Sequence, residues 1–217
     1  MPSREYHEAL WEGVTAGLAP SEFALRREFL LARVFAGERV LDVGCGEGWF
    51  TSELARAGIE AVGLDVAREP LRRARRAELE RAPLGRRPAL DLRLIAADGP
   101  WPLEDASIDA VWAGETIEHV ADTAGWMSEA RRVLRPAGRL LLSTPNHSRL
   151  ALLWLACSRR AFESHFDPLG DHLHFYTRGS LTRLLAVMGF QEVSVRAVAG
   201  RPGARRLLLA QAVRARW

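Results

Sequence analysis

The sequence predicts an α/β protein with a parallel sheet that helices cover on both faces. Strand-like apolar runs alternate with helical segments along the first two thirds of the chain, and such alternation is typical of a buried parallel sheet. The 217 residues, of which 48% are hydrophobic, suffice for one sizeable core. No run approaches the roughly 20 apolar residues of a membrane span.

Local patterns place the individual elements. The expected strands cover residues 39–43, 60–65, 90–96, 109–113, 139–143, 192–198 and 206–213. The expected helices cover residues 21–35, 49–57, a segment that ends near 82, 122–133 and 180–188. Ser21 is the predicted N-cap of the first helix, whose Phe23, Leu30 and Val34 face inward. Gly58 is predicted to end the second helix, and Pro83 the third.

The most informative segment is the turn between the first strand and the next helix. Three glycines line it, and without Cβ atoms they let a ligand lie against the backbone: Gly44, Gly46 and Gly48. A dinucleotide-binding turn needs a further glycine where Trp49 stands. Asp42 and Glu47 flank the turn, and both acids oppose a pyrophosphate. A ligand with an ammonium and a sulfonium suits them, and S-adenosylmethionine (SAM) is such a ligand.

Four further motifs follow the glycine turn in sequence order. They are residues 61–65 (AVGLD), 96–98 (AAD), 109–120 (DAVWAGETIEHV) and 134–143 (LRPAGRLLLS). Together they resemble class I SAM-dependent methyltransferases, and most closely small-molecule members such as the ubiquinone-biosynthesis O-methyltransferases. The resemblance implies a Rossmann-like, seven-stranded, mostly parallel sheet with one antiparallel strand near the C-terminus. The length of the chain and the long connection after the fifth strand predict one domain over residues 1–217 with a lid-like insertion at about 145–177.

The resemblance further implies which residues bind SAM. The three glycines pass under its methionine part, and Asp42 takes its ammonium directly or through water. Asp65 accepts both ribose hydroxyls, which one carboxylate can do. Asp98 accepts from the adenine amino group. Three more residues are expected against the adenine ring or near the sulfonium: Val66, Ala97 and Gly114.

The segment after the fourth strand contains the candidate catalytic residues Glu115, Glu118 and His119. If a helical turn begins there, the three lie on one face at i, i+3 and i+4. His119 is our first choice as general base, with Glu115 as its neighbour. Alternatively, the three hold a divalent cation that lowers the pKa of an acceptor hydroxyl, as in ubiquinone-type relatives. We favour the interpretation without a metal, because Glu-x-x-Glu-His is a permissive pattern.

Residues 145–177 form a connection too long for an ordinary loop. The apolar run 150–157 predicts a substrate lid, an interfacial helix that meets a lipid-like substrate, or a helix packed on the core. The histidine-rich segment 165–177 either grips an acceptor or caps the next helix. Three N-terminal aromatic residues either close over SAM or belong to a disordered end: Tyr6, His7 and Trp11.

Composition narrows the function further. All thirty basic residues are arginine, and the formal net charge is only +3. The arginine-rich segment 68–81 also contains glutamates at helical spacing, so we expect a solvated helix face and no nucleic-acid partner. The first residues show no apolar signal region, which indicates a cytoplasmic protein. Cys45 and Cys157 lack metal-site spacing and imply no disulfide.

The predicted function is methyl transfer from SAM to a small-molecule acceptor, at a hydroxyl oxygen, with lipid-like acceptors included. The alternatives are an RNA or protein methyltransferase and a non-catalytic SAM-binding protein. Trp49 and the flanking acids argue against an NAD-dependent oxidoreductase. The sequence does not identify the acceptor or the oligomeric state.

Overall fold

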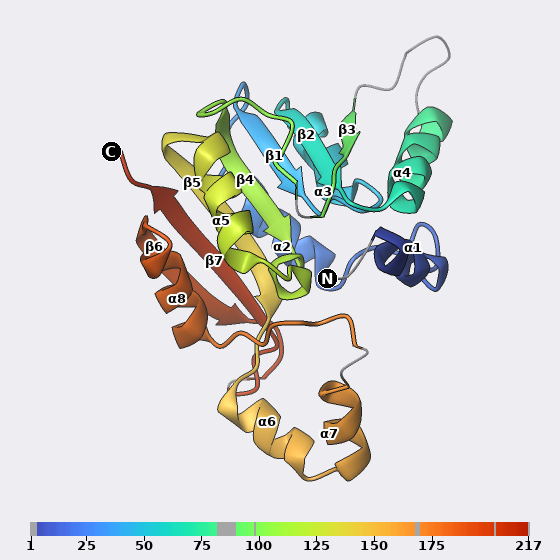
Figure 1. Ribbon diagram of the computed structural model, residues 1–217, viewed down its shortest axis with the longest axis vertical. Helices are drawn as coiled ribbons and strands as arrows, with labels where there is room; N and C mark the ends of the chain where they lie inside the picture. The colour runs from blue at the N-terminus through green and yellow to red at the C-terminus, as the bar shows by residue number, and fades with distance from the viewer. Residues whose placement is uncertain (1–3, 82–89, 98, 168–169, 202, 217) are drawn as a thin grey trace.

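A seven-stranded sheet forms the centre of the computed structural model, which describes residues 4–81, 90–97, 99–167, 170–201 and 203–216. The strand order is β3-β2-β1-β4-β5-β7-β6, and helices lie on both faces (Figure 1). The strands are β1 (Arg39–Val43), β2 (Glu60–Asp65), β3 (Asp91–Leu94), β4 (Ile108–Gly114), β5 (Leu134–Pro145), β6 (Phe190–Val198) and β7 (Leu207–Arg214).

The helices alternate with these strands in the first part of the chain. They are α1 (Arg4–Glu12), α2 (Phe23–Leu31), α3 (Trp49–Arg56), α4 (Arg68–Arg81), the 3₁₀ turn η1 (Ile117–His119), α5 (Thr123–Val133), α6 (Arg149–Ala156), α7 (Arg159–His165) and α8 (Arg178–Val187). Strands β3, β2, β1, β4 and β5 pair in parallel, and β7 runs antiparallel to both β5 and β6. This topology confirms the predicted fold class.

Two apolar clusters pack on opposite faces of the sheet. Because successive strand residues point to opposite faces, Val40 of β1 joins the cluster that contains α2 and α3. Leu41 and Val43 join the larger cluster, to which α5 and α8 contribute. By the same alternation, the side chain of Asp42 lies on the sheet face that α3 covers. This direction determines which residues Asp42 can contact.

Several predicted boundaries were wrong. Helix α2 ends at Leu31 instead of residue 35, and its N-cap is Glu22, with a left-handed φ of 49°. Ser21 does not cap this helix, because its Oγ donates a hydrogen bond to Oε2 of Glu115, 2.8 Å away. Strand β5 begins five residues before the predicted start, since its first residues extend the pairing with β4. The predicted stop at Pro83 lies outside the described residues.

The long connection after β5 contains the helices α6 and α7. They contact each other as a hairpin that projects from the body of the molecule (Figure 1). Neither helix has a buried residue, so the alternative of a helix packed on the core was wrong. Among the described residues, no helix is both long and apolar enough to cross a membrane.

Candidate active site

A cavity of about 300 Å³ opens at the carboxyl ends of the parallel strands. Its lining comes from the segments that directly follow β1, β2, β3 and β4, together with α1. Ligands of open α/β sheets bind at this edge. The lining therefore brings Gly44 and Glu115, which are 71 positions apart in the sequence, together in one hollow.

Of the three glycines in the turn, Gly44 lines this cavity, whereas Gly46 and Gly48 do not. Gly44, Gly46 and Gly48 all have left-handed φ angles, between 53° and 72°. A Cβ on Gly44 would lie 2.5 Å from Oγ1 of Thr116, whose hydroxyl donates to the carbonyl oxygen of Val43. At this position the turn accepts no side chain, and the backbone itself is exposed to the cavity.

Of the acids close to the glycine turn, Asp65 lines the cavity. Its Oδ2 accepts a hydrogen bond from the N–H of Gly46 at 2.8 Å, and its Oδ1 accepts one from the N–H of Ala67 at 2.9 Å. The backbone N–H of Val66 is a third donor to this carboxylate. Burial raises the pKa of Asp65, although the backbone N–H donors oppose this shift. The carboxylate is thus held in one orientation at the end of β2.

Asp42 and Glu47 do not line the cavity, contrary to the direction that we expected for them. The Thr51 hydroxyl donates to Oδ2 of Asp42 at 2.6 Å, and burial raises the pKa of Asp42 to about 7. Glu47 accepts hydrogen bonds from the N–H of Gly17 and from Arg73. Both acids hold neighbouring segments of the fold in place.

Of the other residues predicted to contact SAM, some line the cavity and some do not. Val66 and Ala97 line the cavity beside Asp65, on the side where the adenine was expected. Gly114 lies at the end of β4, directly before the cavity-lining Glu115. Asp98 lies outside the described residues.

Arg26 of α2 is a residue of this region that the sequence interpretation missed. Its side chain is buried, and a Cβ on Gly114 would lie 2.5 Å from its Nη2. Its Nη1 is 3.7 Å from Oε2 of Glu115 and donates to the carbonyl oxygen of Ser21. Arg26 lies on the same helical face as Phe23 and Leu30. An arginine among inward-facing positions is the sequence feature that could have identified it as a buried site residue.

Glu115, Glu118 and His119 do not share one helical face. Glu115 has a left-handed φ of 54°, and the helical turn begins only at Ile117. Glu115 therefore points toward Ser21 and Arg26. Glu118 is fully buried, and its Oε2 accepts a hydrogen bond from Thr144.

His119 lies on the cavity wall beside Asp171. Its Nδ1 lies 2.8 Å from the carbonyl oxygen of Asp171, which can only accept, so Nδ1 carries the proton in this contact. Burial lowers the pKa of His119. A neutral imidazole whose Nε2 is the acceptor results, and this is the form that a general base needs.

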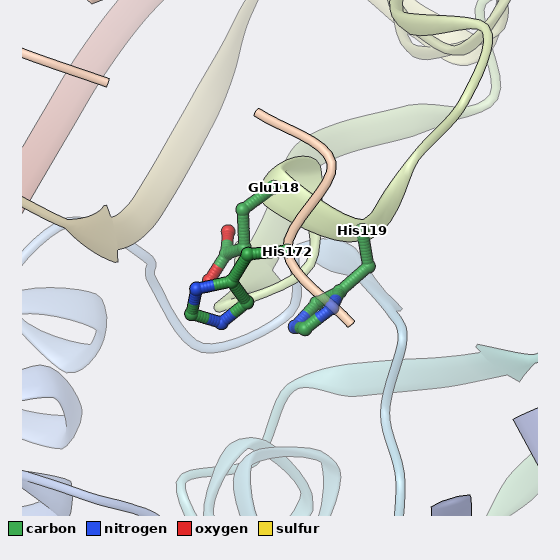
Figure 2. A group of neighbouring side chains, drawn as sticks. All are labelled: Glu118, His119 and His172. Carbon is green, nitrogen blue, oxygen red and sulfur yellow. The ribbon is translucent and has the colours of Figure 1, made fainter. Parts of the chain in front are cut away.

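His172 takes the position that Glu115 was expected to take. Figure 2 shows Glu118 and His119 on the η1 turn and His172 on the segment that crosses it. One ligand atom from each of the three lies within 4.8 Å of the others. The crossing segment is fixed there because Leu173 and His174 both donate backbone N–H bonds to the carbonyl oxygen of Glu118.

Helix α1 closes one side of the cavity, as the first of the two N-terminal alternatives predicted. His7 and Trp11 belong to the lining, whereas Tyr6 does not. The Trp11 ring lies over the glycine turn, 3.0 Å from where a Cβ of Gly46 would be. The carboxylate of Glu8 accepts the N–H bonds of Arg68 and Glu69, and this contact docks α1 on the start of α4.

Comparison with known proteins gives the family. Residues 17–195 match the family model described as a methyltransferase domain. The chain belongs to this methyltransferase family. A ubiquinone biosynthesis O-methyltransferase of Xanthomonas oryzae is 34% identical over 149 residues, which are 68% of this chain and 60% of that protein. A Mycolicibacterium smegmatis protein described as a probable S-adenosylmethionine-dependent methyltransferase is 34% identical over 186 residues, or 83% of this chain and 64% of that protein.

Solved methyltransferase structures share the fold. A phosphoethanolamine N-methyltransferase of Haemonchus contortus, in complex with SAM, has a TM-score of 0.72 at 16% identity, over 98% of this chain and 57% of that one. A methyltransferase of Mesorhizobium loti has a TM-score of 0.68 at 22% identity, over 90% and 98%. These findings confirm the predicted family, fold and cofactor. This methyltransferase chain spans about 60% of the length of the curated ubiquinone-biosynthesis relatives it matches.

Proposed function

We propose that this methyltransferase transfers the methyl group of SAM to a hydroxyl oxygen of a small-molecule acceptor, with His119 as general base. The observation behind this proposal is the position of His119. Its ring lies on the wall of the cavity that Gly44 of the glycine turn also lines, and its Nδ1 is held by the carbonyl oxygen of Asp171. Donor and acceptor sides thus meet in one hollow.

Residues at the carboxyl ends of β1 and β2 would hold the donor. Asp65, whose carboxylate the backbone N–H donors hold at the cavity, accepts ribose hydroxyls. Gly44 lets the methionine part approach the backbone, and Val66 and Ala97 contact the adenine. Asp42 acts on the donor through the loop that it anchors to Thr51, instead of by contact.

Orientation and desolvation supply much of the catalysis in such a transfer. When bound, SAM supplies a methyl group that its sulfonium has already activated. The enclosing walls, among them Trp11, exclude water and hold the acceptor in line with the sulfur–methyl bond. His119 accepts the hydroxyl proton at Nε2 as the oxygen–carbon bond forms.

A divalent cation remains the alternative to this base. Glu118 Oε1 is buried and has no hydrogen-bond partner among the residues that the structure describes. One carboxylate with two imidazoles is a donor set that transition metals accept. In that case Glu118, His119 and His172 would hold the ion, which would lower the pKa of the acceptor hydroxyl. His119 cannot be metal ligand and free base at once, so the two mechanisms are distinguishable.

Oxygen is the proposed acceptor atom because the matched relatives of known name act in ubiquinone biosynthesis as O-methyltransferases. A lipid-like acceptor agrees with the mostly apolar side chains around the cavity, which include Leu10, Val14 and Val120. An RNA or protein acceptor, and SAM binding without catalysis, are the competing functions.

Incorporation of methyl label from SAM tests the function. Small phenols and catechols, small amines, peptides and total RNA are offered separately, with either EDTA or added Mg²⁺, Mn²⁺ or Zn²⁺. We expect label in hydroxyl acceptors in the presence of EDTA. We also expect His119→Ala to lower kcat at least tenfold while the affinity for S-adenosylhomocysteine (SAH) is kept, since a general base contributes about 10²–10⁴-fold.

The matched control is His165→Ala, since His165 does not line the cavity. Label that enters RNA or peptides alone would replace the small-molecule proposal. SAH binding without turnover on any acceptor class would favour a non-catalytic protein. Activity that vanishes with EDTA and returns with one cation would assign His119 to the metal.

A further inference from the structure

Helix α6 has an exposed apolar stripe. Leu150, Leu153 and Trp154 stand at i, i+3 and i+4, which places them on one face of the helix. Their exposed fractions are 49%, 62% and 76%. Phe162 of α7 and Phe166, the C-cap of α7, are also exposed. Apolar side chains of this size are ordinarily buried, so the stripe is a surface that another apolar phase would cover.

Arginines surround the base of this stripe. Arg149, Arg178 and Arg205 line one hollow of about 480 Å³ with Ser148 and Thr177, the N-caps of α6 and α8. Within the described part of the chain, none of these three arginines has an ion pair with a carboxylate. Residues 149–166 contain three arginines and one glutamate, which gives this segment a net charge of +2. The hollow is therefore a positive region directly beside an apolar one.

We propose that the α6–α7 hairpin is a membrane-surface anchor that binds an anionic phospholipid bilayer. Leu150, Leu153 and Trp154 enter the boundary between headgroups and acyl chains, and the arginine-lined hollow receives lipid phosphates. An amphipathic helix with apolar and aromatic residues next to arginines is suited to lie in this interface. The hairpin projects from the body (Figure 1), so the sheet does not obstruct its approach to a flat surface.

Charge favours a bilayer over a second copy of the chain. In a two-fold symmetric contact through α6, the same patch faces itself. Such a contact would gather the arginines of both copies in one interface, where like charges repel. An anionic surface instead attracts each arginine that comes near it.

Vesicle sedimentation tests the proposal. The full chain is mixed with vesicles of phosphatidylcholine alone, and with vesicles in which about one third of the lipid is phosphatidylglycerol. We expect binding to the anionic vesicles that weakens as salt rises. The double variant Leu153→Ser, Trp154→Ser should lose this binding. Arg149→Gln and Arg178→Gln should each weaken it about fivefold.

A matched control exists on the opposite part of the molecule. Leu79 of α4 is 59% exposed, and Leu79→Ser removes a similar exposed apolar side chain without touching the hairpin. Calorimetry with SAH confirms that every variant remains folded at the site. Equal sedimentation of Leu153→Ser, Trp154→Ser and wild type would overturn the proposal. Absence of binding to anionic vesicles would also overturn it. If gel filtration then showed dimers that the double variant abolishes, the apolar stripe would be a contact between two copies of the chain.

Discussion

The side chains of the three acids around the glycine turn point in three different directions. Asp65 faces the cavity, Asp42 is bonded to Thr51, and Glu47 is paired with Arg73. Residue type and spacing predicted that acids would surround this turn. They did not predict the direction of each side chain, because the strand alternation sends Asp42 toward α3 and Arg73 approaches Glu47 from another helix.

Asp65→Asn should weaken SAH binding by about 10- to 100-fold. A hydrogen bond to a charged group contributes roughly 1.5–3 kcal/mol, and the amide keeps the size of the side chain while removing the charge and one acceptor. Isothermal titration calorimetry measures the affinity. Asp105→Asn is the control, because Asp105 lies on the surface in an ion pair with Arg132. Equal affinity of Asp65→Asn and wild type would contradict the ribose assignment.

Asp42 should make the protein less stable as pH rises from about 4 to 7. Burial raises its folded pKa to about 7 from an ordinary value of 3.8, so in this window the folded chain retains a proton that the unfolded chain releases. The free energy of unfolding therefore falls with increasing pH. In Asp42→Asn the slope should be shallower, as urea unfolding at several pH values would show.

The control for this pH dependence is Asp105→Asn, whose slope should equal that of wild type. Asp65 has a raised pKa of the same sign and remains in the Asp42→Asn variant, so we expect a reduced slope rather than a flat one. A slope that Asp42→Asn leaves unchanged would show that Asp42 is ionised in the folded state.

Helix starts illustrate what a local pattern predicts at the scale of an element. Ser21 has the right residue type for an N-cap, yet its hydroxyl bonds Glu115, 94 residues away in the sequence. Thr177, in contrast, caps α8 with a local capping box that includes Ser180. A cap is thus predictable where no distant partner competes for the hydroxyl.

Thr177→Ala should lower the free energy of unfolding by about 1 kcal/mol, the usual cost of a lost N-cap. The N–H of Ser180 loses its side-chain acceptor in this variant. Chemical denaturation measures the loss. Thr182→Ala on the same helix is the control, since its hydroxyl only donates back to the carbonyl oxygen of Arg178. Equal stabilities of the two variants would show that the cap does not stabilise α8.

At the scale of the whole molecule, alternation of strands and helices predicted the layers and the parallel pairing. The strand ends then brought residues 44, 65 and 115 to one edge, as expected. Two arrangements could not be predicted in this way. The η1 turn is too short to align Glu115 with His119, and His172 reaches Glu118 only through tertiary bonds. Periodicity contains no information on such long-range contacts.

The position of helix α1 is a third arrangement that the sequence did not predict. Its own sequence left open whether it is ordered, because its order depends on contacts made elsewhere in the chain. Glu8 binds the first N–H groups of α4, and Arg73 donates to the carbonyl oxygens of Trp11 and Val14. These contacts hold the Trp11 ring over the glycine turn. An aromatic ring above a cationic sulfur is favourable, and it also blocks the exit of a ligand.

Trp11→Ala should therefore speed the dissociation of SAM about tenfold, equivalent to roughly 1.4 kcal/mol of lost contact. Stopped-flow displacement of bound SAM by excess SAH measures this rate. Tyr6→Ala is the matched control, because Tyr6 lies on the same helix without lining the cavity. In wild type, bound ligand should also slow amide hydrogen exchange in α1, since a flap closed over a ligand opens less often. Unchanged dissociation in Trp11→Ala, with exchange in α1 insensitive to ligand, would show that the helix packs beside the site without gating it.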